Sequence, residues 1–111
     1  MIMWKCSVCN YLHEGEGAPE KCPKCGAPQE KFNQLEADKA KLVERSRFSN
    51  GLLMDLIGLL EGIEEMSEQG IEDNLDPGCV KLYTEVKEFA AFARQSAKAE
   101  IENHMGKGKW G

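Results

Sequence analysis

The chain contains two cysteine pairs, Cys6-Ser7-Val8-Cys9 and Cys22-Pro23-Lys24-Cys25, and they decide the fold of its first third. Twelve residues separate the two pairs. In a Cys-x-x-Cys turn both sulfurs project to the same side, so two facing turns give a closed tetrahedral site of four thiolates, which suits zinc or a single iron. Two disulfides and a thiol redox pair are competing interpretations. We expect a metal site with Cys6, Cys9, Cys22 and Cys25 as its ligands.

The residues around the pairs predict a small β domain with zinc-ribbon-like knuckles. Gly26 follows the second pair and Asn10 the first, and these residue types tolerate the positive φ that such a turn requires. Short strands are expected at 3–5, 11–13 and 31–33. A segment of this length is too short to hold itself together by a core alone, which is a further reason to expect a bound metal.

The same segment resembles the rubredoxin-like domain of rubrerythrins over about residues 3–35, including the short spacer between the cysteine pairs. The residues that carry the resemblance are Trp4, Lys5, Cys6, Cys9, Tyr11, His13, Glu14, Gly15, Gly17, Ala18, Pro19, Glu20, Cys22, Pro23, Cys25, Gly26, Ala27, Pro28 and Phe32. The resemblance implies one iron per chain on the four cysteines, cycling between Fe2+ and Fe3+, and a role in one-electron transfer. Asn10 stands where the family usually has glycine.

Length, composition and charge narrow the class of protein. The chain has 111 residues with 14 Lys and Arg against 19 Asp and Glu, a net charge of −5. No apolar run is long enough for a membrane span, and no secretory signal precedes the first cysteine, so we expect a cytoplasmic protein without membrane contact. Eight acidic residues and no Lys or Arg lie between Asp55 and Asp76. Such a run repels phosphate backbones, so nucleic-acid binding is not expected.

Residues 36–111 predict an antiparallel α-helical hairpin with a C-terminal tail that is flexible by composition. Apolar residues recur at intervals of three and four in two segments, which indicates helices at about 36–69 and 77–105. Gly70 is expected to cap the first helix in a left-handed conformation, and Asp76 to cap the start of the second. Gly58 and Gly62 are expected where a neighbouring helix packs closely. Trp110 offers an alternative in which the tail folds back as an anchor.

The helical segment lacks the two-iron site that full rubrerythrins carry. Such a site needs a Glu from each of two helices and a Glu-x-x-His from each of two others. Neither His13 nor His104 has Glu three residues earlier. Glu100 and His104 lie four residues apart on one helix face, which favours a local contact. His13 is a fifth-ligand or proton-transfer candidate, although four thiolates already close the metal site and loop packing is the simpler role.

The sequence thus predicts two domains, a rubredoxin-like metal domain at 1–35 and a helical hairpin at 36–111. The function it favours is an electron carrier that is not itself an enzyme, and that serves a redox protein partner, a reductase or a terminal acceptor. The alternative is a structural zinc-ribbon protein whose hairpin binds another protein. Residues expected to flank the electron route are Lys5, Ser7, Val8 and Lys24.

A two-helix hairpin leaves apolar residues exposed, including Leu53, Leu59, Phe89 and Phe92, so we expect a homodimer through the helices. Docking of the metal domain on the hairpin is the alternative. Cys79 lies in the first turn of the second helix, where the helix dipole favours its thiolate. A redox or intersubunit role would use this thiolate, but a small helix-packing residue is the favoured interpretation of this fifth cysteine.

Overall fold

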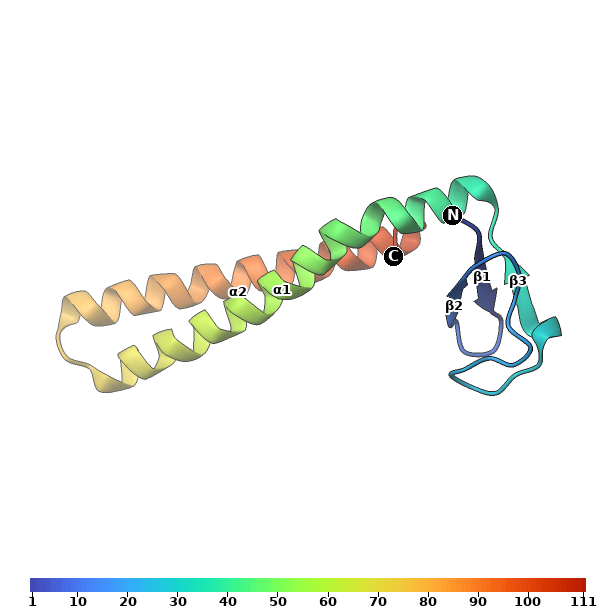
Figure 1. Ribbon diagram of the computed structural model, residues 1–111. Helices are drawn as coiled ribbons and strands as arrows, with labels where there is room; N and C mark the ends of the chain where they lie inside the picture. The colour runs from blue at the N-terminus through green and yellow to red at the C-terminus, as the bar shows by residue number, and fades with distance from the viewer. The chain divides into compact units, whose positions relative to one another are not determined.

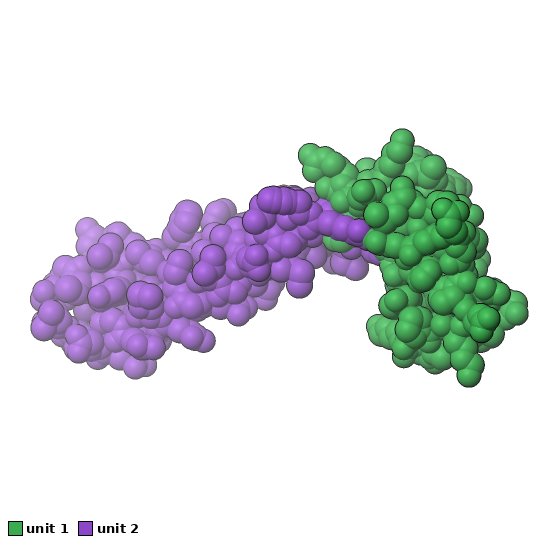
Figure 2. Space-filling view, viewed as in Figure 1, with its two compact units in different colours: residues 1–45, 111 green, residues 46–110 purple.

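The computed structural model describes all 111 residues and divides into two compact units, Met1–Arg45 together with Gly111, and Ser46–Trp110 (Figure 2). The first unit contains a small sheet and the second contains most of a helical hairpin. This confirms the expected fold class, a small cysteine-rich β domain followed by two helices.

The sheet has three short antiparallel strands, β1 (Met3–Cys6), β2 (Leu12–Glu14) and β3 (Phe32–Gln34), in the order β2-β1-β3. The central strand β1 pairs Trp4 with His13 on one side and Cys6 with Phe32 on the other. A 3-10 turn, η1 (Gln29–Lys31), leads into β3. The strands lie within one residue of the positions that the sequence predicts.

The core of this unit is as small as its length implies. One cluster has Cys6, Cys22 and Phe32 as its buried residues, with Trp4, Cys9, Tyr11, Ala18 and Ala27 partly buried around them. Two of the three buried side chains are cysteines of the predicted metal site, so the site and the core are the same feature.

Two long helices follow, α1 (Ala37–Asp73) and α2 (Pro77–Gly106), which run antiparallel as a hairpin (Figure 1). Asp76 caps α2 as predicted, because its carboxylate accepts a hydrogen bond from the Cys79 amide at 2.7 Å. Neither helix contains a stretch apolar enough to cross a bilayer.

The end of α1 differs from the prediction. Gly70 does not end the helix, which continues for three more residues, and Asn74 adopts the left-handed conformation instead with φ 49°. The glycine has a packing role: a Cβ at residue 70 would overlap the ring of Tyr83 in α2. The close approach expected at Gly58 and Gly62 is likewise absent within the chain, since nothing lies within 4 Å of a Cβ built at either position.

These glycines give a matched pair of opposite predictions. Gly58→Ala is expected to raise the free energy of unfolding by about 1 kcal/mol, because alanine is the better helix former and meets no neighbour. Gly70→Ala is expected to lower it by about 1–3 kcal/mol, because the methyl group displaces the Tyr83 ring. Urea titration followed by far-UV circular dichroism, at equal protein concentrations, measures both. If both variants raised the free energy of unfolding by the same amount, the packing assigned to Gly70 would be wrong.

Candidate metal centre

The first cysteine knuckle is a tight turn at the end of β1. The Asn10 amide donates to the Cys6 carbonyl at 2.9 Å, and the Cys6 amide donates to the Tyr11 carbonyl at 2.8 Å. Asn10 has φ 69°, the left-handed conformation expected for it. The turn therefore brings Cys6 and Cys9 to the same side, as the spacing predicts.

The second knuckle repeats the same two hydrogen bonds. The Gly26 amide donates to the Cys22 carbonyl at 2.8 Å, and the Cys22 amide donates to the Ala27 carbonyl at 2.8 Å. Gly26 has φ 77°. The two knuckles thus have equivalent backbones, and each presents two sulfurs to the other.

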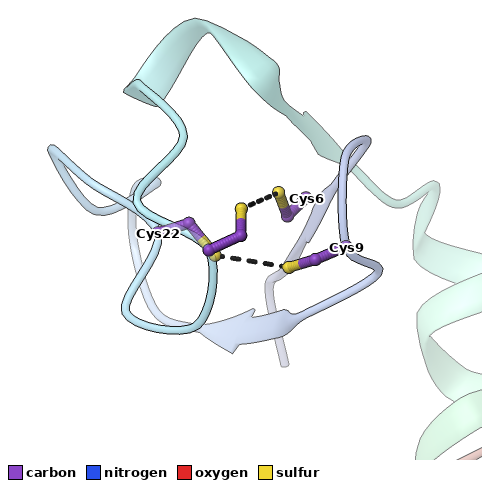
Figure 3. Close-up of side chains that lie close together, drawn as sticks. Cys6, Cys9 and Cys22 are labelled. Atoms are coloured by element: carbon purple, nitrogen blue, oxygen red, sulfur yellow. Dashed lines mark hydrogen bonds between the residues drawn. The ribbon is translucent and has the colours of Figure 1, made fainter.

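The four sulfurs converge on one point (Figure 3). The Sγ atoms of Cys6 and Cys25 are 3.7 Å apart, those of Cys9 and Cys22 are 3.5 Å apart, and all four lie within 4.8 Å of one another. Four sulfurs bound tetrahedrally at about 2.3 Å from one ion are about 3.8 Å apart. The sulfurs are also too far apart for disulfides, which need about 2.05 Å. The site therefore fits one tetrahedral metal ion.

Backbone amides of the knuckles donate to the sulfurs. Val8 and Cys9 donate to the Cys6 sulfur, and Tyr11 donates to the Cys9 sulfur. Lys24, Cys25 and Ala27 do the same in the second knuckle. Four of these amides lie inside the Cys-x-x-Cys turns, and the other two donors, Tyr11 and Ala27, lie beyond them and emerge only from the structure. These six amide N–H groups partly offset the negative charge of the four thiolates around the ion.

The thiols differ in acidity. Burial raises the pKa of Cys6 and Cys22, but the two amides on each sulfur outweigh it and hold both below the ordinary value, that of Cys22 at about 7. Burial keeps the pKa of Cys9 above the ordinary value. The Ala27 amide lowers the pKa of Cys25, yet desolvation and the neighbouring thiols raise it to about 12. Because metals bind thiolates, metal entry releases the thiol protons of the empty site.

The site has an inner and an outer side. Cys6 and Cys22 are buried, whereas Cys9 is half-buried and Cys25 is exposed. Of the four residues expected beside the electron route, Ser7, Val8 and Lys24 are exposed and Lys5 is half-buried. The second cysteine of each knuckle thus lies nearest to solvent.

The remaining sequence candidates lie away from the sulfurs. His13 is not part of the metal cluster: its ring packs beside Gly15, with Nε2 3.1 Å from a Cβ built there, which supports the loop-packing interpretation. His104 contacts Asn50 across the hairpin, with Nδ1 2.7 Å from Oδ1, while its Nε2 is 3.9 Å from a Glu100 oxygen. The side-chain amide of Asn50 also donates to the Lys109 carbonyl at 2.8 Å, so the tail packs on α1.

The structure gives no support for an acidic thiol at Cys79. Its pKa is raised, first because the thiol donates a hydrogen bond to the Asp76 carboxylate and second because of burial. The capping residue that starts α2 thus also makes this thiol less acidic.

Asp76→Asn tests this cause, because asparagine still caps the helix but carries no charge. We expect the pKa of Cys79 to fall, and its alkylation by iodoacetamide at pH 8 to become several-fold faster in metal-loaded protein, since the thiolate is the reactive form. Mass spectrometry of the modified peptide measures the rate. An unchanged rate would contradict the role of the carboxylate.

The fold and the four-cysteine site define a rubredoxin-like metal-binding domain. Residues 4–33 match the family model described as rubrerythrin, rubredoxin-like domain. This part of the chain is a rubredoxin-like domain of the rubrerythrin type, and it is followed by a helical hairpin.

Individual relatives support this assignment. Reverse rubrerythrin-1 of Clostridium acetobutylicum is 33% identical over 96 residues, which cover 86% of this chain and 46% of the relative. Rubrerythrin of Nitratidesulfovibrio vulgaris is 53% identical over 32 residues, 29% of this chain and 17% of the relative. Rubrerythrin of Clostridium perfringens is 47% identical over 32 residues, again 29% of this chain, and 16% of the relative. The chain thus spans less than half of the curated relatives it matches. No solved structure matches it.

Proposed function

We propose that the four-cysteine site binds one iron and that the protein is a one-electron carrier. The observation that carries the proposal is the pair of equivalent knuckles, with four converging sulfurs, in a domain of the rubrerythrin type. Bound there, an iron ion supplies reversible exchange between Fe2+ and Fe3+. Four protein ligands complete a tetrahedral coordination sphere, so the domain offers a substrate no open position.

The chain's own residues favour electron transfer without rearrangement. The turns are fixed by backbone hydrogen bonds of 2.8–2.9 Å, and six amides are already directed at the sulfurs. Donors oriented in advance need not reorganise when the charge of the site changes. Cys9 and Cys25 face outward, so a partner that docks beside Val8 and Lys24 approaches the site closely.

Charge at this face governs the approach of an electron acceptor. Lys24→Glu is expected to slow oxidation of the reduced protein by the ferricyanide anion about 3- to 10-fold at low ionic strength, because the variant repels the acceptor. The difference is expected to shrink in salt. Stopped-flow absorbance measures the rate. Lys107→Glu, an equal charge change in the tail, is the control and should have a smaller effect; equal effects would contradict this docking face.

Peroxide reduction within this chain is not proposed. The seam between α1 and α2 holds an ion pair, Glu64 with Arg94, at 2.6 Å from Nε to Oε2, and no Glu-x-x-His motif. The chain is better suited to supplying electrons to a separate oxidoreductase or peroxidase than to being one. A cytoplasmic location is consistent with this role, because reduced thiols are available there to bind metal. The hairpin is then a module for dimerisation or partner docking.

The alternative is a structural zinc protein, because zinc accepts the same four thiolates. A visible absorption spectrum before and after dithionite, with metal analysis, separates the two. We expect protein from iron-replete cells, purified without oxygen, to be red, to contain one iron per chain and to bleach on reduction. A colourless protein with stoichiometric zinc that resists iron reconstitution would overturn the electron-carrier proposal.

A further inference from the structure

The two helices contact each other through one stripe of residues on each. The stripes follow a heptad repeat, with steps of three and four, and every member is buried or half-buried. On α1 the stripe is Ser46, Asn50, Leu53, Ile57, Leu60, Glu64, Ser67 and Ile71, and on α2 it is Val80, Tyr83, Lys87, Ala90, Arg94, Ala97, Ile101 and His104. The expectation that Leu53 stays exposed is therefore wrong, because it packs half-buried between the helices. Two cross-hairpin contacts, Asn50 with His104 and Glu64 with Arg94, join these two stripes, and Lys87 of the α2 stripe also pairs with Glu68, one position after the α1 stripe.

A second stripe lies one residue earlier on each helix, and it is apolar over residues 52–66 of α1 and 82–89 of α2. Its large members are Leu52, Leu56, Leu59, Ile63 and Met66 on α1, and Leu82, Val86 and Phe89 on α2. All eight are exposed, from 37% for Ile63 to 68% for Leu59 and Phe89. The hairpin's own contacts therefore leave this stripe uncovered on both helices.

The handedness of the helices puts both apolar stripes on one side of the hairpin. A step of one residue turns the position by about 100° around a helix axis. Because α1 and α2 are both right-handed and run in opposite directions, the same backward step turns the two stripes toward the same side. We name this surface of eight side chains the apolar face.

The opposite side of the hairpin is mainly polar. The positions one residue after the stripes that join the two helices carry many of the hairpin's charges. The large apolar side chains at these positions, such as Met54, are isolated from one another. The charged residues of this side are Arg47, Glu61, Glu65, Glu68, Glu72, Lys81, Glu88, Lys98 and Glu102. The contrast between the two sides marks the apolar face as an interaction surface.

Charge along the hairpin indicates which occupant covers this face. The half nearest the connecting turn, residues 61–88, has nine acidic and two basic side chains, a net charge of −7. The other half, residues 46–60 and 89–110, has five basic and three acidic side chains, a net charge of +2. Most of these charges lie on the polar side or near the turn, so they act along the length of the bundle and not as contacts across the apolar face. An antiparallel copy keeps the two acidic halves apart, whereas a parallel copy places −7 beside −7.

The size of the face also fits a second copy. Eight large side chains, each more than a third exposed, present on the order of 700 Å², close to the roughly 800 Å² that each partner contributes to a standard interface. A face that meets its own copy about a two-fold axis must be self-complementary, and an apolar face between oppositely charged ends meets this requirement.

We propose that the apolar face binds a second copy of this chain in antiparallel orientation and forms a four-helix bundle. The proposed function treats the hairpin as a module for dimerisation or partner docking, and this proposal specifies a second copy of the chain as its partner. It does not depend on whether the metal is iron or zinc, so its failure and that of the electron-carrier proposal are observed separately.

Sedimentation velocity on the full metal-loaded chain tests the association. The expected mass is twice 12.4 kDa. Leu59→Glu with Phe89→Glu should raise the dimer dissociation constant at least about 100-fold, because two charges would be buried against apolar side chains. Met54→Glu, on the opposite side and 67% exposed, is the matched control and should leave the dimer intact. A monomeric wild-type chain, or a double variant that stays dimeric, would overturn the proposal. The visible spectrum of each variant shows that its metal domain is intact.

The orientation is tested with Cys79, the one cysteine outside the metal cluster, which lies near the connecting turn. Spin labels on Cys79 of zinc-loaded protein should be roughly 40 Å apart in an antiparallel dimer, because they lie at opposite ends of a bundle that rises 1.5 Å per residue. Pulsed dipolar spectroscopy measures this distance. A separation below about 25 Å would mean a parallel dimer and overturn the proposed orientation.

Discussion

Replacing Cys22 with serine will abolish stoichiometric metal binding and unfold the sheet and both cysteine knuckles, while α1 and α2 keep their helical signal. Cys22 is 2% exposed and is one of only three buried residues in the core cluster of the knuckles. Metal binding supplies roughly 10–16 kcal/mol to folding in small four-ligand domains. A core of three residues cannot replace it. Metal analysis reports the loss of binding, and amide chemical-shift dispersion reports the loss of structure.

The fifth cysteine provides the control for this experiment. Cys79→Ser removes the same atom from a half-buried position outside the metal cluster, so metal content and spectrum should stay as in the wild type. Full metal occupancy and dispersed amide signals in Cys22→Ser would contradict the view that the site and the core are one feature. Chelation of the wild-type protein should reproduce the effect of the substitution.

Replacing Arg94 with methionine will destabilise the hairpin by about 2 kcal/mol, because it leaves Glu64 charged and unpaired in the seam. Arg94 donates twice to Glu64, at 2.6 and 3.2 Å, and the two side chains are only 21% and 19% exposed. The expected loss is smaller than the roughly 3–5 kcal/mol of a fully buried pair, because part of the pair reaches water. Urea titration monitored by circular dichroism measures it.

The same pair makes the stability of the hairpin depend on pH. The hydrogen bond from Arg94 lowers the pKa of Glu64 below its ordinary value of 4.5. The pair therefore adds stability above the pKa of the unfolded chain, and this contribution disappears as the pH falls through the folded pKa. Arg94→Met should lose less stability than the wild type between pH 5 and 3.

The double variant Glu64→Gln with Arg94→Met is the control, because it removes both charges. It should recover part of the stability lost in Arg94→Met, since no unpaired carboxylate remains in the seam. If the double variant lost as much stability as Glu64→Gln and Arg94→Met lose separately when added together, the two side chains would not interact.

The sequence predicted the metal domain well because its constraints are local. The spacing within each cysteine pair fixes where the sulfurs point, and Asn10 and Gly26 adopt the positive φ expected of them. The apolar residues next to the pairs were sufficient to predict the three short strands. The amides of Tyr11 and Ala27 were missed because every residue has an amide, and only the path of the backbone shows which ones reach a sulfur.

Where the hairpin prediction failed, tertiary contacts decided the outcome. Gly70 has the residue type of a helix end, but the Tyr83 ring from α2 makes it a packing position inside α1. Cys79 lies in the first turn of α2, but its hydrogen bond to the Asp76 carboxylate raises its pKa. Neither contact can be found from one-dimensional periodicity, because each depends on how two residues meet in space.

The heptad spacing of the hairpin also determines how its length can change. Removing seven residues from α1 and the facing seven from α2 shortens the hairpin by two turns, and every remaining side chain keeps its side. Removing a single residue from one helix instead turns everything beyond it by about 100°, which would rotate the apolar face into the seam or onto the polar side. Natural or engineered versions of this hairpin should therefore differ in length by matched multiples of seven.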